Sequence, residues 1–366
     1  MNRKDNLLSF FEDLEDPRRE KCKKHLLLDI VAISVCGVIC GADSWDEIED
    51  YGKVKYDWLQ TFLSLPNGIP SHDTFNRVFS NLCSEKFEIC FNKWVASLAN
   101  LLKGEVVALD GKTIRGAKVN GVSSIHMVSA WACESNLVLG QQKVGVKTNE
   151  ITAIPNLIEV LALEGTTVTI DAMGCQTEIA QKIVDAEANY ILAVKANQPV
   201  LLENIEDEFR FNKNVDKFVD VDYGHGRIET RTCSVINQFI HIEHPDKWAG
   251  LKSVVRIESI REFKGTDKVE TATRYYISSL KQNAEKLQHA VRNHWGIENK
   301  LHWTLDVAFD EDRDRKRKGN ASQNFSLINK IALNLAKQEK TCKLGVKAKR
   351  KKAGWDNQYL KKLLKF

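Results

Sequence analysis

Two short apolar runs, each followed at once by an aspartate, constrain this chain more than any other feature of its sequence. Residues 106–109 are Val-Val-Ala-Leu and precede Asp110. Residues 167–170 are Thr-Val-Thr-Ile and precede Asp171. Such runs are typical of buried strands. A carboxylate at the end of a buried strand is poorly solvated and needs a partner, which a divalent cation, an arginine or a helix N-terminus can supply.

The pattern around these runs predicts the order of elements in the central part of the chain. The predicted elements are strands at 106–110, 124–131 and 137–144, a helix at 150–163, a strand at 167–171, a helix at 177–188 and a strand at 190–194. The first three strands would form an antiparallel meander. The order β-β-β-α-β-α-β is that of a ribonuclease-H-like core, an α/β layer fold that presents catalytic groups at strand ends.

The spacing of apolar residues differs outside this core. Residues 1–100 carry apolar residues at helical spacing and predict a helical N-terminal domain that could bind DNA ends. Within it, Ser71 is a candidate N-cap for a helix through Phe79. That segment could be a helix-turn-helix-like DNA reader or part of a helical bundle without DNA contact. Residues 101–340 are predicted to form the α/β domain, interrupted around 205–280 by a β-rich insertion.

The last part of the chain, residues 341–366, is a basic tail. It holds nine Lys and Arg against one acid, a local charge of +8 in a chain whose net charge is +4. A basic tail on a slightly acidic body suits a polyanionic partner such as DNA. Two alternatives are a solvated, disordered tail and a structural helix packed on the core through its apolar residues. Those apolar residues are Trp355, Tyr359, Leu360, Leu363 and Leu364.

Cysteine usage and hydropathy exclude several classes of protein. The nine cysteines are odd in number and contain no Cys-x-x-Cys pair, which argues against a disulfide framework and a cysteine zinc site. The N-terminus lacks the apolar core of a signal peptide. The one strongly apolar stretch, residues 30–42, is too short to cross a bilayer and is predicted to be a buried helix. We therefore expect a soluble, cytoplasmic protein with no membrane partner.

A third acid, Glu298, stands in a helical stretch beside Trp295 and Ile297, which are expected to face the core. Carboxylates from separate elements can together hold two Mg²⁺ ions, because Mg²⁺ prefers hard oxygen ligands. Such an ion pair serves phosphoryl transfer. Trp295, Trp303 and Phe309 are predicted core anchors, although an exposed tryptophan could instead wedge against a flipped base.

Several longer motifs resemble those of the H-repeat-associated, ISAs-type insertion-sequence transposases of bacteria. The motifs are Leu-Asp-Gly-Lys-Thr-Ile-Arg-Gly at 109–116, Ile-Asp-Ala-Met-Gly-Cys-Gln at 170–176, Tyr-Ile-Leu-Ala-Val-Lys-Ala-Asn-Gln at 190–198, Tyr-Gly-His-Gly-Arg-Ile-Glu at 223–229 and His-Trp-Gly-Ile-Glu-Asn at 294–299. Shorter matches lie at 70–75 and 350–356. The resemblance spans nearly the whole chain and keeps its order.

The resemblance implies a DDE triad of Asp110, Asp171 and Glu298, both catalytic and metal-binding. The gaps are 61 and 127 residues, and the β-rich insertion would account for the longer one. It implies a Mg²⁺-dependent transposase, with Mn²⁺ as a substitute, that cuts and joins double-stranded DNA at terminal inverted repeats and in the target. Because two DNA ends must meet, a homodimer on DNA is expected.

Six further residues are candidate DNA contacts, with ordinary surface charge as the alternative for each. They are Lys112, Arg115, Lys195, His225, Arg292 and Lys300. The wider group of related transposases often has Tyr, Arg and Lys around the final glutamate. This chain has Val291, His294 and Leu305 at those offsets, so Arg292 and Lys300 are the expected partial substitutes.

Two rival functions remain open from the sequence. One is a catalytically inactive, DNA-binding remnant of a mobile element, against which the intact triad argues. The other is a stand-alone metal-dependent nuclease without strand transfer.

Overall fold

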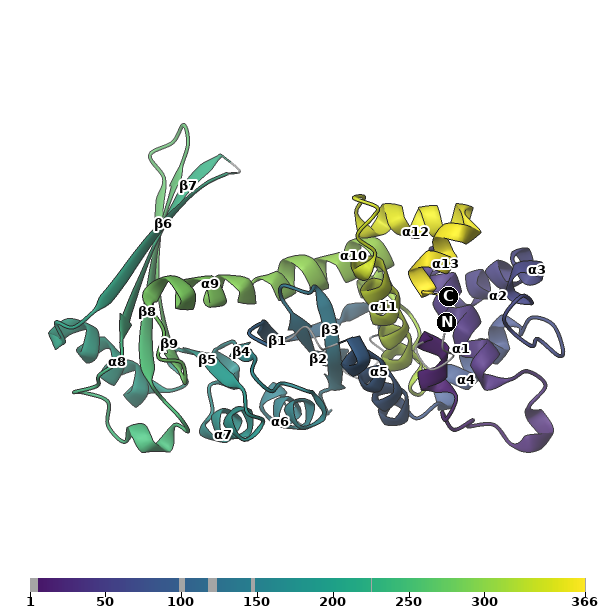
Figure 1. Ribbon diagram of the computed structural model, residues 1–366, viewed down its shortest axis with the longest axis horizontal. Coiled ribbons are helices and arrows are strands. Elements are labelled where there is room, and N and C mark those ends of the chain that lie inside the picture. The colour runs from purple at the N-terminus through teal and green to yellow at the C-terminus, as the bar shows by residue number, and fades with distance from the viewer. Residues whose placement is uncertain (1–5, 99–102, 118–123, 146–148, 225, 366) are drawn as a thin grey trace.

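A mixed sheet of nine strands runs through the molecule in the order β3-β2-β1-β4-β5-β9-β8-β7-β6 (Figure 1). The structure is a computed structural model that describes residues 6–98, 103–117, 124–145, 149–224 and 226–365. The strands are β1 (Val106–Ile114), β2 (Ile125–Ala132), β3 (Leu137–Lys143), β4 (Thr167–Ile170), β5 (Asn189–Val194), β6 (Asp216–Gly224), β7 (Arg227–Ile236), β8 (Ser253–Phe263) and β9 (Val269–Ser278).

The helices surround this sheet and extend beyond one end of it. The α-helices are α1 (Leu27–Ile39), α2 (Trp45–Val54), α3 (Tyr56–Leu59), α4 (His72–Asn81), α5 (Ser84–Leu98), α6 (Glu150–Val160), α7 (Thr177–Asp185), α8 (Pro199–Phe211), α9 (Ala284–His294), α10 (Trp303–Phe309), α11 (Ala321–Gln338), α12 (Val346–Trp355) and α13 (Asn357–Leu364). Short helical turns are η2 (Leu7–Phe11), η3 (Glu20–Cys22), η4 (Arg115–Ala117), η5 (Ala172–Gly174), η6 (Pro245–Lys247), η7 (Ile297–His302) and η8 (Glu311–Arg313).

The first five strands confirm the predicted ribonuclease-H-like order. β1 pairs antiparallel with β2, and β2 with β3, while β1, β4 and β5 run parallel. Helices α6 and α7 lie together on one side of these strands and α9 crosses the other side (Figure 1). In the paired stretch, β1 is apolar throughout and β4 alternates Thr with Val and Ile, and all but Thr167 of these residues are buried, as expected where helices cover both faces of a parallel pair.

One predicted strand end is wrong. Asp110 does not end β1, which continues to Ile114 because residues 111–114 pair antiparallel with β2. The parallel pairing of β1 with β4 does stop just before Asp110, at Leu109 opposite Ile170. The polar residues after Asp110 hid this extension, since they break the apolar run but not the strand.

The predicted β-rich insertion is present and joins the same sheet. β9 pairs antiparallel with β5, from Ile191 opposite Ser278 to Val194 opposite Tyr275. The outer strands β6, β7 and β8 add to β9 in turn and rise from the body as a long blade (Figure 1). α9 then returns over the sheet and packs on β6, β7, β1 and β4.

The N-terminal helices pack around α11, which is buried along nearly its whole length. Trp45 on α2 stacks on Phe79 of α4 with ring centroids 5.1 Å apart, and meets Phe325 of α11 edge-on at 5.1 Å. α11 also packs on β3, so helices and sheet share one hydrophobic core. The predicted buried helix at 30–42 is α1, and no described helix is both long and apolar enough to cross a bilayer. Ser71 does precede α4, but its side chain makes no capping hydrogen bond to the helix backbone.

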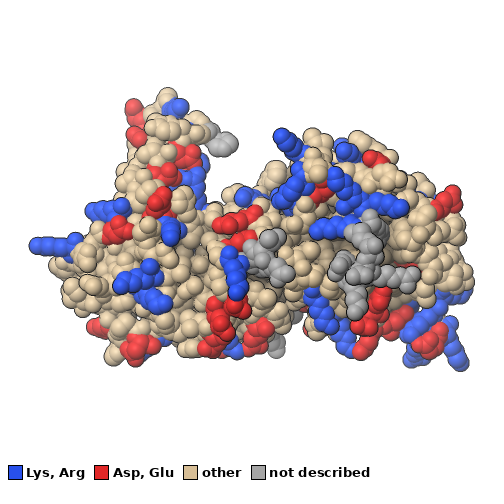
Figure 2. All heavy atoms as spheres, in the orientation of Figure 1, with Lys and Arg blue, Asp and Glu red and all other residues tan. Residues whose placement is uncertain are grey.

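The basic tail is folded, so the disordered alternative is wrong. α12 and α13 pack on α1, α10 and α11, and bury Tyr359, Leu360, Leu363 and Leu364. Lys and Arg side chains remain on the outer surface over these two helices (Figure 2).

Arg350 of α12 holds this packing together from inside. Its Nε donates to the carbonyl of Val38 at 2.9 Å, its Nη2 donates to Asp43 at 2.8 Å, and its Nη1 donates to the carbonyl of Ala308. The guanidinium also lies 4.2 Å from the ring centroid of Phe309. One side chain therefore joins α12 to the ends of α1 and α10.

Arg350→Met should lower the free energy of unfolding by about 3 kcal/mol, because two buried carbonyls and Asp43 lose their donor. Lys351→Met removes the same charge from an exposed neighbour and should change stability by less than about 0.5 kcal/mol. Urea unfolding of both variants measures the difference. Equal effects would show that Arg350 acts only as a surface charge.

Candidate active site

Strand pairing places the first two predicted acids side by side. Leu109 of β1 lies opposite Ile170 of β4 in a parallel pair, so Asp110 and Asp171 are the next residues on adjacent strands. Both lie at the carboxyl edge of the sheet, where open α/β folds bind ligands. Asp171 also accepts a hydrogen bond from the backbone N–H of Met173 at 3.1 Å, which fixes its carboxylate at the start of η5.

The third acid reaches this edge from the far side of the sequence. Glu298 is exposed and lies in η7, a π-helical turn that follows α9 and contacts β1. Ile297 and Leu301 of this turn are buried and anchor it on the core. Single π-turns inside helices are common at functional sites, because the extra residue re-aims the side chains that follow.

The prediction of core anchors is confirmed for Phe309 and wrong for the two tryptophans. Phe309 is buried, whereas Trp295 is 41 % and Trp303 is 61 % exposed. The π-turn changes which face of the helix meets the core, and the buried positions are Ile297 and Leu301 instead.

Asp110 interacts electrostatically with Asp171 and with Glu298. The pKa of Asp110 is raised to about 7, mainly by burial and also by the negative charges of Glu150, Asp171 and Glu298, while the backbone N–H of Gly111 opposes the shift. A half-buried carboxylate near three others is difficult to ionise unless a cation compensates the charge.

Two side chains beside Asp110 escaped the sequence analysis. Glu150 begins α6 and shares a hydrogen bond of 2.5 Å with His126 Nε2. A Cβ built on Gly111 would lie 2.0 Å from Glu150 Oε1 and 2.5 Å from His126 Nε2, so a larger residue at 111 would push these two side chains out of their present positions. Nothing in the sequence distinguishes Glu150 from an ordinary first-turn acid.

His302 is the second neighbour that the sequence did not reveal. Its Nδ1 lies 3.5 Å from Asp110 Oδ2. Burial lowers the pKa of His302 to about 4, and the charges of Lys112 and Lys330 act in the same direction. The ring is therefore neutral at pH 7. Its place four residues after Glu298, one helical turn on, is the only signal that could have found it.

Lys112 forms ion pairs with carboxylates outside the predicted triad. Its Nζ donates to Glu311 at 2.9 Å and to Asp306, and only 11 % of its side chain is exposed. Burial raises the pKa of Glu311, but the charges of Lys112 and Lys330 outweigh it and hold that pKa below its usual value. Ser326 of α11 also donates to Glu311, at 2.8 Å. Lys112 thus ties β1 to α10 and α11, and its ammonium is not presented to a phosphate.

Comparisons with known proteins show the family of this chain. The family model described as "Transposase DDE domain" matches residues 102–335, and one described as "DDE_Tnp_1-associated" matches residues 8–95. The chain belongs to the DDE transposase family. The relatives include "Putative transposase YncI" of Escherichia coli O157:H7, 44 % identical over 98 % of this chain and 94 % of that one. Another is "H repeat-associated putative transposase YhhI" of Escherichia coli K12, 39 % identical over 98 % and 97 %.

Among solved structures, a piggyBac transposase synaptic complex with hairpin DNA covers 98 % of this chain and 80 % of its own, with a TM-score of 0.45 and 12 % identity. The transposase resemblance of the sequence motifs is thus confirmed by the family and by its full-length relatives.

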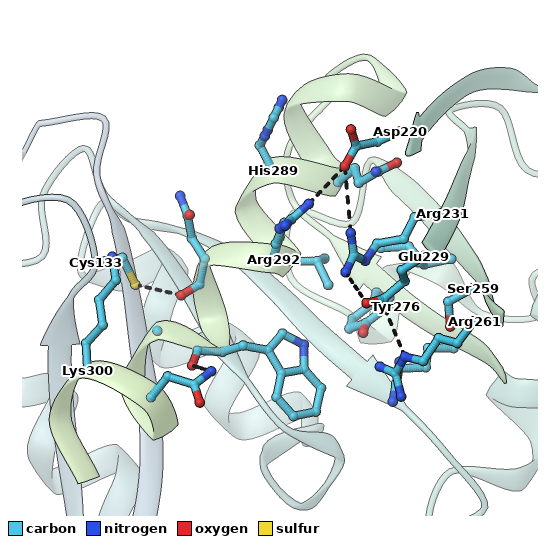
Figure 3. Close-up of a pocket in the computed structure, with 18 of the residues that line it drawn as sticks. Cys133, Asp220, Glu229, Arg231, Ser259, Arg261, Tyr276, His289, Arg292 and Lys300 are labelled. Atoms are coloured by element: carbon cyan, nitrogen blue, oxygen red, sulfur yellow. Dashed lines mark hydrogen bonds and ion pairs between the residues drawn. The ribbon is translucent and has the colours of Figure 1, made fainter. Parts of the chain in front are cut away.

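In this DDE transposase a cleft of about 700 Å³ opens between strands β7 to β9 and helix α9 (Figure 3), and its lining includes Asn299 and Lys300, which follow Glu298 in the chain. Its basic residues are Arg227, Arg231, Arg261, Arg274, Arg292 and Lys300. Most of them are neutralised: Arg231 and Arg261 bind Glu229 at 2.7 and 3.0 Å. Arg292 binds Asp220 at 2.9 Å and also Asp222.

Two cations of this cleft keep their charge free. Within the described chain, Arg274 and Lys300 have no acidic partner. Arg274 lies 5.4 Å from the ring centroid of the exposed Trp295. The transposase therefore presents a positive, partly aromatic surface directly beside its third acid.

The other predicted DNA contacts have different surroundings. Arg115 is exposed, with Asp312 at 3.7 Å. Lys195 is exposed and follows β5, so it lies at the same sheet edge as Asp110 and Asp171. His225 lies outside the described residues.

The donor set suits a divalent metal ion. The three predicted acids offer carboxylate oxygens, which Mg²⁺ and Mn²⁺ prefer, and a cation would favour the ionised form of Asp110, whose pKa is raised by burial and by neighbouring negative charges. Within the described residues, no three His, Cys, Asp or Glu side chains are gathered closely enough to hold an ion in their present positions. The residues fit a divalent ion only in the chemistry of their oxygen atoms.

The raised pKa of Asp110 makes the stability of the metal-free transposase depend on pH. The folded state keeps this proton up to about pH 7, whereas the unfolded chain releases it near pH ~4. Because the folded state binds more protons in that window, the free energy of unfolding should fall as pH rises through it, by up to about 4 kcal/mol.

Asp110→Asn should remove that part of the fall, since the amide does not titrate. Urea unfolding in EDTA across the window measures it, with the exposed Asp246→Asn as control. If Asp110→Asn retains the wild-type pH dependence, the carboxyl is not the group that titrates there.

Proposed function

We propose that this protein cleaves DNA at the ends of an insertion sequence and transfers the freed strand to target DNA, with Asp110, Asp171 and Glu298 as its catalytic carboxylates. The observation that supports the proposal is the pairing of β1 with β4, which makes Asp110 and Asp171 neighbours at one sheet edge, with Glu298 close enough for its charge to contribute to the raised pKa of Asp110. Membership of the DDE transposase family supports the same reading.

The carboxylates would hold divalent metal ions, which supply activation of water and stabilisation of the attacking and leaving oxygens in phosphoryl transfer. The chain's own contribution is position. Strand pairing would keep Asp110 and Asp171 next to each other, and the buried side chains of η7 would anchor the turn that carries Glu298. Neutral His302 packs against Asp110 without adding positive charge that would compete with a cation.

Double-stranded DNA is the proposed substrate and partner. Phosphates would meet Arg274 and Lys300 in the cleft beside Glu298, and Lys195 and Arg115 at the neighbouring edge. Arg292 would join them only by exchanging its carboxylate partners for a phosphate. A homodimer is proposed for the DNA complex, because strand transfer needs two ends together.

We also propose a role for each part of the chain. Residues 1–100 would be a DNA-binding helical domain and 101–340 the catalytic domain, with its insertion around 205–280. Residues 341–366 would stabilise the fold, because α12 and α13 pack on α1, α10 and α11.

Asp110→Asn, Asp171→Asn or Glu298→Gln should each abolish cleavage while leaving DNA affinity within about threefold, because each removes a metal ligand but no basic surface. Loss of a residue that merely supports a metal ligand lowers metal affinity or activity by about 10–100-fold. Loss of a ligand itself should therefore lower the cleavage rate by more than about 100-fold. The assay uses a duplex carrying the DNA that flanks the gene, and Asp246→Asn is the control. A triad variant that cuts at the wild-type rate rejects the assignment.

The same assay separates the rival functions. Joined products indicate a transposase, cleavage without joining indicates a stand-alone nuclease, and binding without cleavage by the wild-type protein indicates an inactive remnant.

Cleavage should also require an oxygen-preferring cation. We expect activity with Mg²⁺ or Mn²⁺, none in EDTA, and none with Ca²⁺, whose longer and more variable coordination suits this transfer poorly. Full activity in EDTA contradicts the metal-dependent mechanism.

A further inference from the structure

A second basic cleft lies in the N-terminal helices, at the opposite end of the molecule from the insertion strands (Figure 1). It has a volume of about 940 Å³ and is formed by the segment around η3, the turn before α4, and α4 itself. Its basic residues are Arg18, Arg19, Lys21, Lys24 and Arg77, and no Asp or Glu is among its lining residues. Nothing in the catalytic mechanism uses this surface.

One of these cations is structural. Arg18 donates to both oxygens of Asp16, at 2.9 and 2.7 Å, and to the carbonyl of His25 at 2.7 Å. Only 5 % of its side chain is exposed. Asn67 donates to the carbonyl of Lys24, which joins the same segment to the turn before α4. These contacts fix the backbone on which the other cations stand.

The remaining four cations are uncompensated. Arg19, Lys21, Lys24 and Arg77 are exposed, and within the described chain none of them has an acidic partner. In the cleft beside Glu298, by contrast, most arginines are already paired. Four free positive charges around one hollow favour a polyanion.

α4 supplies the rigid side of this cleft. Its opposite face is pinned in the core by Phe75, Val78 and Phe79. Arg77 and Asn81 stand one helical turn apart and both line the cleft. The lining also includes two hydroxyl and two amide side chains beside Pro17, Cys22, His25 and Ile69, and hydroxyls and amides, with Arg and Lys, are groups that contact phosphate and sugar in protein–DNA complexes.

We propose that this cleft is a second DNA-binding site, which grips the phosphate backbone of duplex DNA at a distance from the cut. The proposal rests on the function proposed above for the choice of DNA as the polyanion. It places the sequence-independent part of N-terminal binding on Arg19, Lys21, Lys24 and Arg77, and it leaves catalysis to the sheet edge.

The test uses full-length protein in EDTA and a fluorescent duplex of arbitrary sequence, so that no terminal repeat need be known. The variant is Arg19→Gln/Lys21→Gln/Lys24→Gln/Arg77→Gln. The matched control is Lys213→Gln/Lys217→Gln/Lys247→Gln/Lys252→Gln, four lysines that are also exposed but lie outside this cleft. Melting temperatures should stay alike, since every substituted side chain is on the surface.

We expect the slope of log affinity against log salt to flatten by about 0.9 for each lost phosphate contact, and so by about three to four units in the cleft variant. Affinity near physiological salt should fall at least about tenfold, and the control should flatten clearly less. Hydroxyl-radical footprinting should then lose protection in the stretch away from the cut, while cleavage at saturating protein persists.

An unchanged salt slope in the cleft variant overturns the proposal. So does a variant that keeps its DNA affinity but loses binding to RNA or to anionic lipid vesicles. Failure of the proposed function is distinguishable, because a wild-type protein that binds DNA through this cleft and never cuts it would keep the salt effect and lack the products.

Discussion

The parallel pairing of β1 with β4 is the constraint on which the candidate site depends. With Leu109 opposite Ile170, two aspartates far apart in sequence become neighbours at the sheet edge. The charge of Asp171 adds to burial and to the charge of Glu150 in raising the pKa of Asp110. A shift of one residue in this register would turn one carboxylate to the opposite face of the sheet. The proposed chemistry therefore requires this register.

A buried polar network keeps the third acid in place against that sheet. Lys112, two residues after Asp110, binds Asp306 and Glu311, and Glu311 is held in turn by α11. Glu298 lies one π-turn before α10, which carries Asp306. The strand and the helix that bear the proposed catalytic residues are therefore tied together by charges that a partly apolar interior makes costly to separate.

Charge is arranged differently at the two ends of the molecule. Beside Glu298 most arginines are paired with acids of the insertion strands, which leaves Arg274 and Lys300 free. In the N-terminal cleft the free cations have no acid facing them. The C-terminal helices add exposed lysines to the surface but bury Arg350 as a structural link. The net charge of +4 reveals none of these three local arrangements of charge.

Much of this protein was predictable from its sequence, because local patterns report local burial. The order of strands along the chain, the insertion and the buried helix at 30–42 follow from apolar periodicity, and the proposed acids Asp110, Asp171 and Glu298 come from motifs that resemble those of the family. Tertiary structure alone decided which charges are free. Lys112 and Arg350 look like surface cations in sequence and are buried partners in the fold, while Glu150 and His302 reach Asp110 only through strand pairing and the π-turn. The physical reason is that the charge state and role of a side chain depend on its neighbours in space, and those neighbours come from segments up to about three hundred residues apart, as with Arg350 and Val38.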